Sequence, residues 1–448
     1  MALVDFEQTV TCPPPAGRGG DFKRGGLVST QRDANLNVVR RWVDEVFNQH
    51  QLESVEHLKV PDYVDWNPYP GQDIALAGFK AVLASWTKAF PDFRYDVDEE
   101  LAEGDIVVCI GKWYGTHTEQ YMGMPPTGTK LSARRIDIVR LAGDKMTERW
   151  GTGNELQMLK FLGVAKPAVA LDRADGPEGV LRRFVTEVLE NKNLASIDEL
   201  VDQDARGTAT EMITFIALSA VLDGMTASID QLSVDGDRVS STLSIRGAFA
   251  REFWDTAPDG EPIEVQGALS ARLNGGKIVD LDLDLPLEPI AVRLGLPADL
   301  LSSATTTVAP TGSPGDGRFV LRSFVQDVLN QHRLHKVSGL VVDRARDYLQ
   351  ESLTTAALFA AFPDHQFNIE RVVIDGQRVT VLATFAGTHR GTFLGIEPSG
   401  RGVTTRSISL FTVEDGKITD LIFNFDLHTL LTQLGAFPDA GMFGATAG

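Results

Sequence analysis

The chain contains 448 residues, more than a single hydrophobic core usually organises, so its length predicts several domains. Asp and Glu number 61 against 42 Lys and Arg, and the formal charge of −19 argues against binding to nucleic acids or anionic membrane surfaces. Two cysteines without a paired spacing, and no apolar run of membrane-spanning length, predict a cytoplasmic protein without a disulfide framework or a metal site.

Residues 1–33 are rich in glycine and proline and predict a flexible tail. After this tail, one series of features occurs three times, and we number the three occurrences copies one, two and three. Each copy begins with an amphipathic helix centred on an aromatic residue, predicted over residues 38–47, 180–189 and 320–329. Ten residues after each aromatic residue stands a leucine, namely Leu52, Leu194 and Leu334. A fixed spacing repeated three times predicts tandem domains.

The second part of each copy predicts antiparallel strands. In copy three, apolar and polar residues alternate over 367–373, 379–387, 402–413 and 418–425, with turns at Asp375-Gly376 and Asp415-Gly416. A turn glycine precedes a second glycine by eleven residues in each copy, and a turn lysine precedes the glycine of a closing Leu-Gly by eighteen. Helices followed by a meandering sheet are typical of α+β folds. We expect three tandem cone-shaped α+β barrels, each with a pocket lined by inward strand residues.

Stretches rich in proline, glycine and small polar residues separate the copies. They place the predicted domains at residues 34–165, 177–297 and 317–438.

Copy one carries several motifs in a fixed order. They are Trp66-Asn67-Pro68-Tyr69-Pro70-Gly71, Phe90-Pro91-Asp92, Gly115-Thr116-His117, Pro125-Pro126-Thr127-Gly128 and Glu148-Arg149-Trp150. This series resembles the SnoaL-like polyketide cyclase (ester cyclase) family of the nuclear-transport-factor-two-like superfamily. Copy three resembles it through Phe362-Pro363-Asp364 and Gly387-Thr388-His389, whereas copy two keeps the spacing and loses nearly all polar motif residues.

The resemblance implies an enzyme that closes a ring on a polyketide ester by acid/base catalysis, without metal or cofactor. The family's carboxylate falls nine residues before the closing Leu-Gly glycine, at Asn154 in copy one, Pro286 in copy two and Asp426 in copy three. Asparagine cannot take up a proton at neutral pH, so copy one departs from the family pattern there. The corresponding histidines are His117 and His389. Further expected pocket residues are Trp66, Asn67, Trp113, Arg134, Trp150 and Arg406.

Each of these residues also has a structural interpretation. A histidine at a strand end can hold a loop, and Asp426 can cap a helix that begins at Leu427. Arg134 and Arg406 can pair with acidic neighbours on a sheet face, and the tryptophans can belong to the core.

The two motif-bearing copies differ in what they retain. From the leucine after the first helix to the Phe-Pro-Asp position, copy one has 38 residues and the other copies 28, so the Trp-Asn-Pro-Tyr-Pro-Gly loop belongs to copy one. Copy three has His389 and Asp426 instead. The sequence thus offers two candidate pockets, with copy two as scaffold.

The leading interpretation is a polyketide cyclase or isomerase of secondary metabolism, such as antibiotic biosynthesis, acting on a bulky apolar carbonyl substrate. An epoxide-opening enzyme is an alternative, but the sequence shows no convincing carboxylate pair inside one copy. A small-molecule binding protein that lost catalysis is another. Fusion of three copies predicts an internal pseudo-oligomer or a homo-oligomer.

Overall fold

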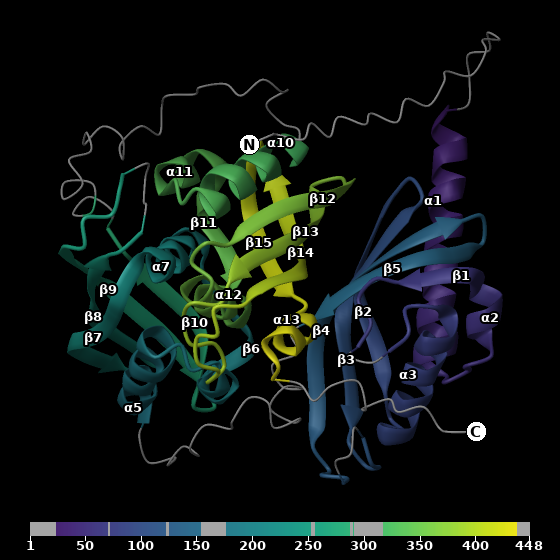
Figure 1. Ribbon diagram of the computed structural model, residues 1–448, viewed down its shortest axis with the longest axis horizontal. Coiled ribbons are helices and arrows are strands. Elements are labelled where there is room, and N and C mark those ends of the chain that lie inside the picture. The colour runs from purple at the N-terminus through teal and green to yellow at the C-terminus, as the bar shows by residue number, and fades with distance from the viewer. Residues whose placement is uncertain are drawn as a thin grey trace.

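The computed structural model describes residues 24–69, 72–121, 125–153, 176–251, 256–286, 290 and 317–436. Three successive units share one order of elements: a helix that continues as a π-helix, short helical turns, a strand, a longer helix and four antiparallel strands (Figure 1). The predicted α+β class is therefore confirmed. No helix in these ranges is both long and apolar enough to cross a membrane.

Copy one consists of α1 (Arg24–Arg41), η1 (Trp42–Asn48), α2 (Ser54–Leu58), β1 (Lys59–Asp65), α3 (Leu76–Ala89), β2 (Arg94–Glu103), β3 (Ile106–Thr116), β4 (Lys130–Ala142) and β5 (Lys145–Gly153). Copy two consists of α5 (Gly176–Arg183), η2 (Phe184–Glu190), η3 (Leu194–Ser196), α6 (Ile197–Leu200), β6 (Val201–Thr208), α7 (Ala209–Val221), β7 (Leu222–Asp235), β8 (Arg238–Phe249), β9 (Pro262–Asn274) and β10 (Lys277–Asp284). Copy three consists of α10 (Gly317–Ser323), η4 (Phe324–Asn330), η5 (Leu334–Lys336), α11 (Val337–Leu340), β11 (Val341–Tyr348), α12 (Leu349–Ala361), β12 (Gln366–Asp375), β13 (Arg378–Thr388), β14 (Gly402–Glu414), β15 (Lys417–Phe425) and α13 (Leu427–Leu434).

The N-terminal boundary differs from the expectation. Residues 24–33, which composition assigned to a flexible tail, form the start of α1. This helix is held from outside its own copy, because Arg32 lies 2.6 Å from Asp375 at the β12 turn. Composition could not reveal such a long-range contact. Residues 1–23 lie outside the described ranges, as do residues 154–175 and 291–316, so the linker boundaries stay predictions.

The repeated lysines hold the repeated short helices. Lys145, Lys277 and Lys417 donate to the carbonyls of Glu56, Asp198 and Ser338, at 3.5, 2.5 and 2.8 Å. The second glycine of each copy lies where the strand touches the residue after the long helix. A Cβ on Gly115 would lie 3.0 Å from Phe90, and one on Gly387 would lie 3.1 Å from Phe362. The equal spacings thus reflect equal packing in each copy.

Copies two and three share one sheet with the strand order β12-β13-β14-β15-β11-β6-β10-β9-β8-β7. The two edge strands β6 and β11 pair antiparallel, with Gly207 opposite Asp347. Equivalent side chains cross this junction in both directions, since Arg206 binds Asp420 and Arg346 binds Asp280. The junction is therefore isologous, like a twofold dimer interface built within one chain.

Copy one keeps a separate sheet, ordered β1-β5-β4-β3-β2. Its β1 edge is covered by Ile74 and Ala75, which follow the loop found only in this copy: the Asp65 N–H donates to the Ile74 carbonyl at 2.8 Å, and Val64 bridges Ala75. An uncovered edge strand is a template for pairing. The insertion therefore decides which copies can pair through their edges.

Copy three lies between the other two copies (Figure 1). Its outer sheet face packs on the outer face of copy one in a single apolar cluster that includes Val108, Ile138, Leu382 and Leu410. In copy two the equivalent outward positions are polar, for example Ser240, which is exposed. Strands buried on both faces lose their polar alternation, so the sequence of each strand records which face is covered.

Candidate active site

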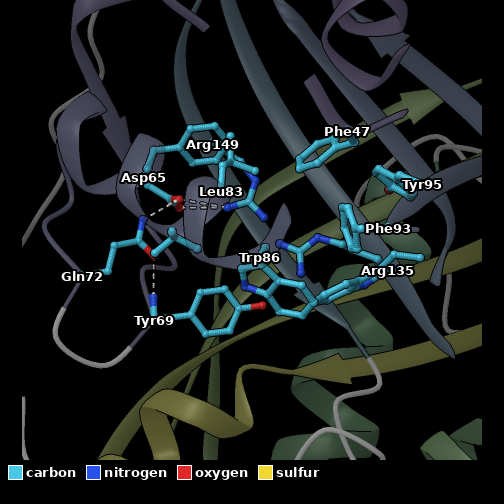
Figure 2. A pocket seen from close by; sticks show the side chains of 13 residues that line it. Phe47, Asp65, Tyr69, Gln72, Leu83, Trp86, Phe93, Tyr95, Arg135 and Arg149 are labelled. Atoms are coloured by element: carbon cyan, nitrogen blue, oxygen red, sulfur yellow. Dashed lines mark hydrogen bonds and ion pairs between the residues drawn. The ribbon is translucent and has the colours of Figure 1, made fainter. Parts of the chain in front are cut away.

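The interior of copy one contains a cavity of about 50 Å³. Figure 2 shows its aromatic wall, formed by Phe47 of η1, Trp86 of α3 and Phe93 before β2, and its polar end, formed by Asp65, Arg135 and Arg149. The full lining is Phe47, Asp65, Tyr69, Gln72, Phe79, Val82, Leu83, Trp86, Phe93, Tyr95, Trp113, Arg135 and Arg149. An apolar cavity with a few converging polar groups is the usual form of a small-molecule site.

The polar end is a buried network of ion pairs. Arg149 Nη1 lies 3.1 and 3.0 Å from the two carboxylate oxygens of Asp65, and Arg149 Nε lies 2.9 Å from Asp137 Oδ1. Arg135 Nε donates to Asp137 Oδ2 at 2.9 Å. Asp65 also accepts from the Asn67 backbone N–H at 3.2 Å and from Gln72 Nε2 at 3.4 Å. Arg149 thus joins two buried carboxylates.

Burial shifts the protonation equilibria of this network. It raises the pKa of Asp65, although the Asn67 N–H and nearby Lys59 oppose the shift. Burial likewise raises the pKa of Asp137. Lys59 is 1% exposed, and its Nζ lies over the rings of Tyr63 at 3.6 Å and Phe79 at 4.3 Å. Burial lowers the pKa of Lys59 to about 7. A carboxylate with a raised pKa beside fixed cations is suited to proton transfer.

The other copies act as internal controls for this network. The strand register places Gly267, Leu269 and Leu281 of copy two at the positions of Arg135, Asp137 and Arg149. Copy three has Ser407, Ser409 and Leu421 there. Lys59 corresponds to Val201 and Val341. The fold therefore forms without these buried charges, whose burial costs several kcal/mol per ion.

The sequence-predicted wall residues fall on different faces. Trp113 lines the cavity. Trp150, by contrast, lies on the outer face of the sheet within the cluster that joins copies one and three. Trp66 is 36% exposed and donates from Nε1 to Glu148 at 3.3 Å. Asn67 donates from Nδ2 to Asp426 Oδ2 of copy three at 2.9 Å.

The two predicted pocket arginines serve the interface between copies one and three. Arg134 Cζ lies 3.6 Å from the Tyr348 ring centroid, and its Nε lies 3.2 Å from Glu351. Arg406 Cζ lies 5.6 Å from the Trp66 ring, and its Nη1 donates to the Trp66 carbonyl at 2.9 Å. Trp66 and Tyr348 occupy equivalent positions, so this interface is isologous as well. These contacts correspond to the structural interpretation of Arg134 and Arg406, in which both arginines bind neighbours on a sheet face.

Each predicted histidine holds the loop that follows its strand: His117 follows β3, and His389 follows β13. His117 Nδ1 accepts from the Thr127 N–H at 3.1 Å, and His389 Nδ1 accepts from the Ser399 N–H at 3.2 Å. Each ring packs on the phenylalanine of its Phe-Pro-Asp motif, with centroids 5.4 and 5.2 Å apart. Burial lowers the pKa of both imidazoles. His117 does not line the cavity described above.

The predicted carboxylate positions have different outcomes. Asn154 lies outside the described residues. Asp426 caps α13, because its Oδ1 accepts from the Thr429 N–H at 2.9 Å, and it also accepts from Asn67. The hydrogen bonds of His389 and Asp426 thus go to different partners. At the positions equivalent to Trp113 and Tyr95, copy three has Phe385 and Phe367, whose centroids are 5.3 Å apart.

Sequence reasoning missed the residues that form the polar end of the cavity. The signal that would have found them is the alternation of inward and outward side chains along each strand. Residues 131, 133, 135, 137 and 139 face the core of copy one, so Arg135 and Asp137 occupy positions where a meander strand normally places apolar residues. Charged residues at inward positions are expensive, and they would have pointed to this site.

The fold and this cavity together define a class: α+β cones, one of which encloses an apolar cavity with buried ion pairs at one end. The sequence profile of the SnoaL-like polyketide cyclases matches residues 37–162 and 319–434, more than half of the chain. The chain belongs to this family, which supports a cyclase-type role in general terms. No curated protein sequence matches the chain.

Several solved structures are similar to a part of the chain. A proposed polyketide cyclase from Acidithiobacillus ferrooxidans is 25% identical over 29% of this chain and 94% of its own, with a TM-score of 0.27. AclR of Streptomyces galilaeus, a proposed hydroxylase, is 27% identical over 30% of this chain and 96% of its own, with a TM-score of 0.26. IdmH of Streptomyces antibioticus, a proposed polyketide cyclase, is 27% identical over 29% and 98%, with a TM-score of 0.26.

Proposed function

We propose that copy one is the active site of a cofactor-independent cyclase or isomerase that acts on an apolar carbonyl substrate, with Asp65 as the general base. The observation that carries this proposal is the buried charge network of copy one: copy two has uncharged residues at every one of these positions, and copy three keeps only Asp347, at the position of Asp65. Charges that the fold does not need, placed at the end of an apolar cavity, point to chemistry.

The proposed reaction follows from the positions of these groups. The Asp65 carboxylate removes a proton next to a substrate carbonyl, and the electron pair moves into an enolate whose oxygen the Arg135 or Arg149 guanidinium stabilises. In a cyclase, the enolate carbon then attacks a second carbonyl of the same substrate and forms a carbon–carbon bond. The alkoxide produced takes the proton back from Asp65, so no external reagent is consumed.

Substrate binding requires the loop after β1 to move. The cavity of about 50 Å³ has room for a few water molecules, whereas a polyketide is much larger. Tyr69 and Gln72, which line the cavity, belong to this loop, and Gln72 also touches Asp65 (Figure 2). We infer that the loop opens to admit substrate and that closure returns Gln72 to the carboxylate.

The test compares equivalent aspartates of two copies. Polyketide methyl esters that bear a second ketone serve as probes, and ring closure is followed by mass spectrometry. Asp65→Asn should reduce turnover by about 10²–10⁴-fold, the contribution of a positioned base, whereas Asp347→Asn at the same position of copy three should retain it. Retained turnover in Asp65→Asn together with loss in Asp426→Asn would place the reaction in copy three and overturn the proposal.

A second candidate function is epoxide opening. Its support is that Arg149 binds both Asp65 and Asp137, two carboxylates of one copy that the sequence analysis did not connect. One carboxylate could take a proton from water while the other protonates the epoxide oxygen. This candidate ranks second because Asp137 does not line the cavity. Styrene oxide in ¹⁸O-labelled water tests it: a labelled diol that depends on both aspartates favours epoxide opening.

The histidine assignments and Asn154 stay predictions of the family resemblance. The binding-protein alternative also stays open to test, since a probe that binds tightly and is recovered unchanged from the wild type would favour it.

A further inference from the structure

The loop after β1 belongs to copy one but is attached to copy three. The contacts that hold it include a hydrogen bond from Arg406 to the Trp66 carbonyl at 2.9 Å, one from Asn67 Nδ2 to Asp426 at 2.9 Å, and the His428 ring 5.1 Å from the Tyr69 ring. The copy-three residues are Arg406 in β14, the cap residue Asp426 and His428 in the first turn of α13. The loop therefore lines the cavity of copy one while it is attached to Arg406, Asp426 and His428 of copy three. We call these three residues the platform.

Asn67 links this platform to the proposed base. Its side chain is fixed at both ends, because Nδ2 donates to Asp426 and Oδ1 accepts from the Gly151 N–H at 3.2 Å. Its backbone N–H donates to Asp65 Oδ1 at 3.2 Å. The position of the Asn67 backbone, and with it one hydrogen bond to Asp65, thus depends on the carboxylate of Asp426.

We propose that Asp426 is a positioning residue for the copy-one site: it anchors Asn67, orients Asp65 and sets the closed position of the loop that bears Tyr69. This inference rests on the proposed role of Asp65 for its catalytic meaning. The anchoring itself is independent of that role, because it concerns contacts between copies.

A comparison of the copies supports this role of Asp426. Asp426 is 8% exposed and satisfies the first turn of α13 as well as the loop, so it serves two segments that are distant in sequence. Copy two has Gln266 and Pro286 at the positions of Arg406 and Asp426, and the structure pairs copy two with copy three through an edge strand instead of this face. Copy three, which contacts the loop, therefore has Arg406 and Asp426, whereas copy two has neither residue type at these positions.

The test uses Asp426→Asn in the full chain. Asparagine remains a good helix cap, so α13 should persist, but an amide replaces one of the two acceptor oxygens. We expect amide hydrogen exchange in residues 66–69 and 72–75 to accelerate about tenfold, as for loss of a hydrogen bond to a charged group. Asn67→Ala should give the same acceleration from the other side of the contact.

The matched control is Gln433→Ala, also on α13. Gln433 binds Thr404 through both its amide atoms, at 2.8 and 2.7 Å, and does not touch the loop. It should leave exchange in residues 66–69 and 72–75 unchanged. Unchanged exchange in both Asp426→Asn and Asn67→Ala would overturn the proposal, as would equal acceleration in Gln433→Ala.

A second readout separates positioning from stability. If Asp426 orients the base, Asp426→Asn should lower kcat more than it raises KM for the polyketide ester probe. It should also shift the acid limb of the pH profile upward, because Asp65 loses part of a hydrogen bond that lowers its pKa. A loosened loop in a chain whose Asp65→Asn variant is fully active would refute the proposed function and leave the anchoring intact.

Discussion

Arg149 holds Asp65 by both carboxylate oxygens, with Nη1 at 3.1 and 3.0 Å, and this pair places a positive charge against the proposed base. Replacing Arg149 with leucine, as in the other copies, should raise the pKa of Asp65 further, because a nearby positive charge favours the ionised carboxylate. Since a general base acts in its ionised form, the acid limb of the pH profile should move up by about 1–3 pH units. A profile identical to the wild type would show that Arg149 does not act on the base.

The whole network can be exchanged for the copy-three residues. Arg149→Leu alone removes the guanidinium that pairs with the buried Asp65, while Arg135 still binds Asp137, and should lower the free energy of unfolding by about 3–5 kcal/mol. The triple variant Arg135→Ser, Asp137→Ser, Arg149→Leu should lose less stability than the single variant while losing turnover, because these residues already fill the same fold in copy three. Urea unfolding of both variants measures this. A triple variant less stable than the single one would show that the network is structural.

The interface between copies one and three depends on Arg134. Its side chain is 8% exposed and that of its partner Glu351 is 3% exposed, whereas the Arg94 and Asp96 side chains are 57% and 48% exposed. Arg134→Met should lower the free energy of unfolding by about 3–5 kcal/mol, because it removes the guanidinium that lies against the buried Glu351 carboxylate. Arg94→Met, the control, should cost only about 0–1 kcal/mol. Adding Glu351→Gln should restore part of the loss, and equal costs for both arginines would contradict the prediction.

Lys59 predicts a defined pH dependence of stability. Its pKa is about 7 in the folded protein and 10.5 as an ordinary side chain, so the unfolded chain binds more protons between these values. The cost of keeping Lys59 buried is therefore complete below about pH 7 and disappears as pH rises toward 10.5. Lys59→Met should exceed the wild type in stability by at least about 1 kcal/mol at pH 6, and by less at pH 9. Lys80→Met, on the surface, should show no such trend.

Copy two suggests the test for the histidines, because it has Phe249 at their position. His117→Phe removes the acceptor for the Thr127 N–H and should lower the free energy of unfolding by about 1–3 kcal/mol. Turnover by the folded fraction should change less than tenfold, as measured with the polyketide ester probe below the melting transition. A loss of 100-fold without a change in melting temperature would show that His117 acts in the chemistry.

The repeat made the fold predictable, and the copy-three strands show how closely. The expected strand over 379–387 is β13 (Arg378–Thr388), and the turn at Asp375-Gly376 has Gly376 at φ 62°. These features are local: alternation fixes a strand, and a glycine permits the turn. The site was less predictable because it depends on which face of a strand each residue occupies. Arg134 and Arg135 are adjacent, yet one binds Glu351 across the interface and the other lines the cavity.

Family, fold class and the unequal polar residues of the three copies were determined by the sequence alone, because motif order and spacing are properties of the chain. The tertiary structure decided which residues meet. It joined copy two to copy three through edge strands and copy one to copy three through sheet faces, since inward and outward positions alternate along each strand. It also brought Asp426, expected as a base of copy three, against Asn67 of copy one. Such contacts link residues far apart in the chain, and no local pattern records them.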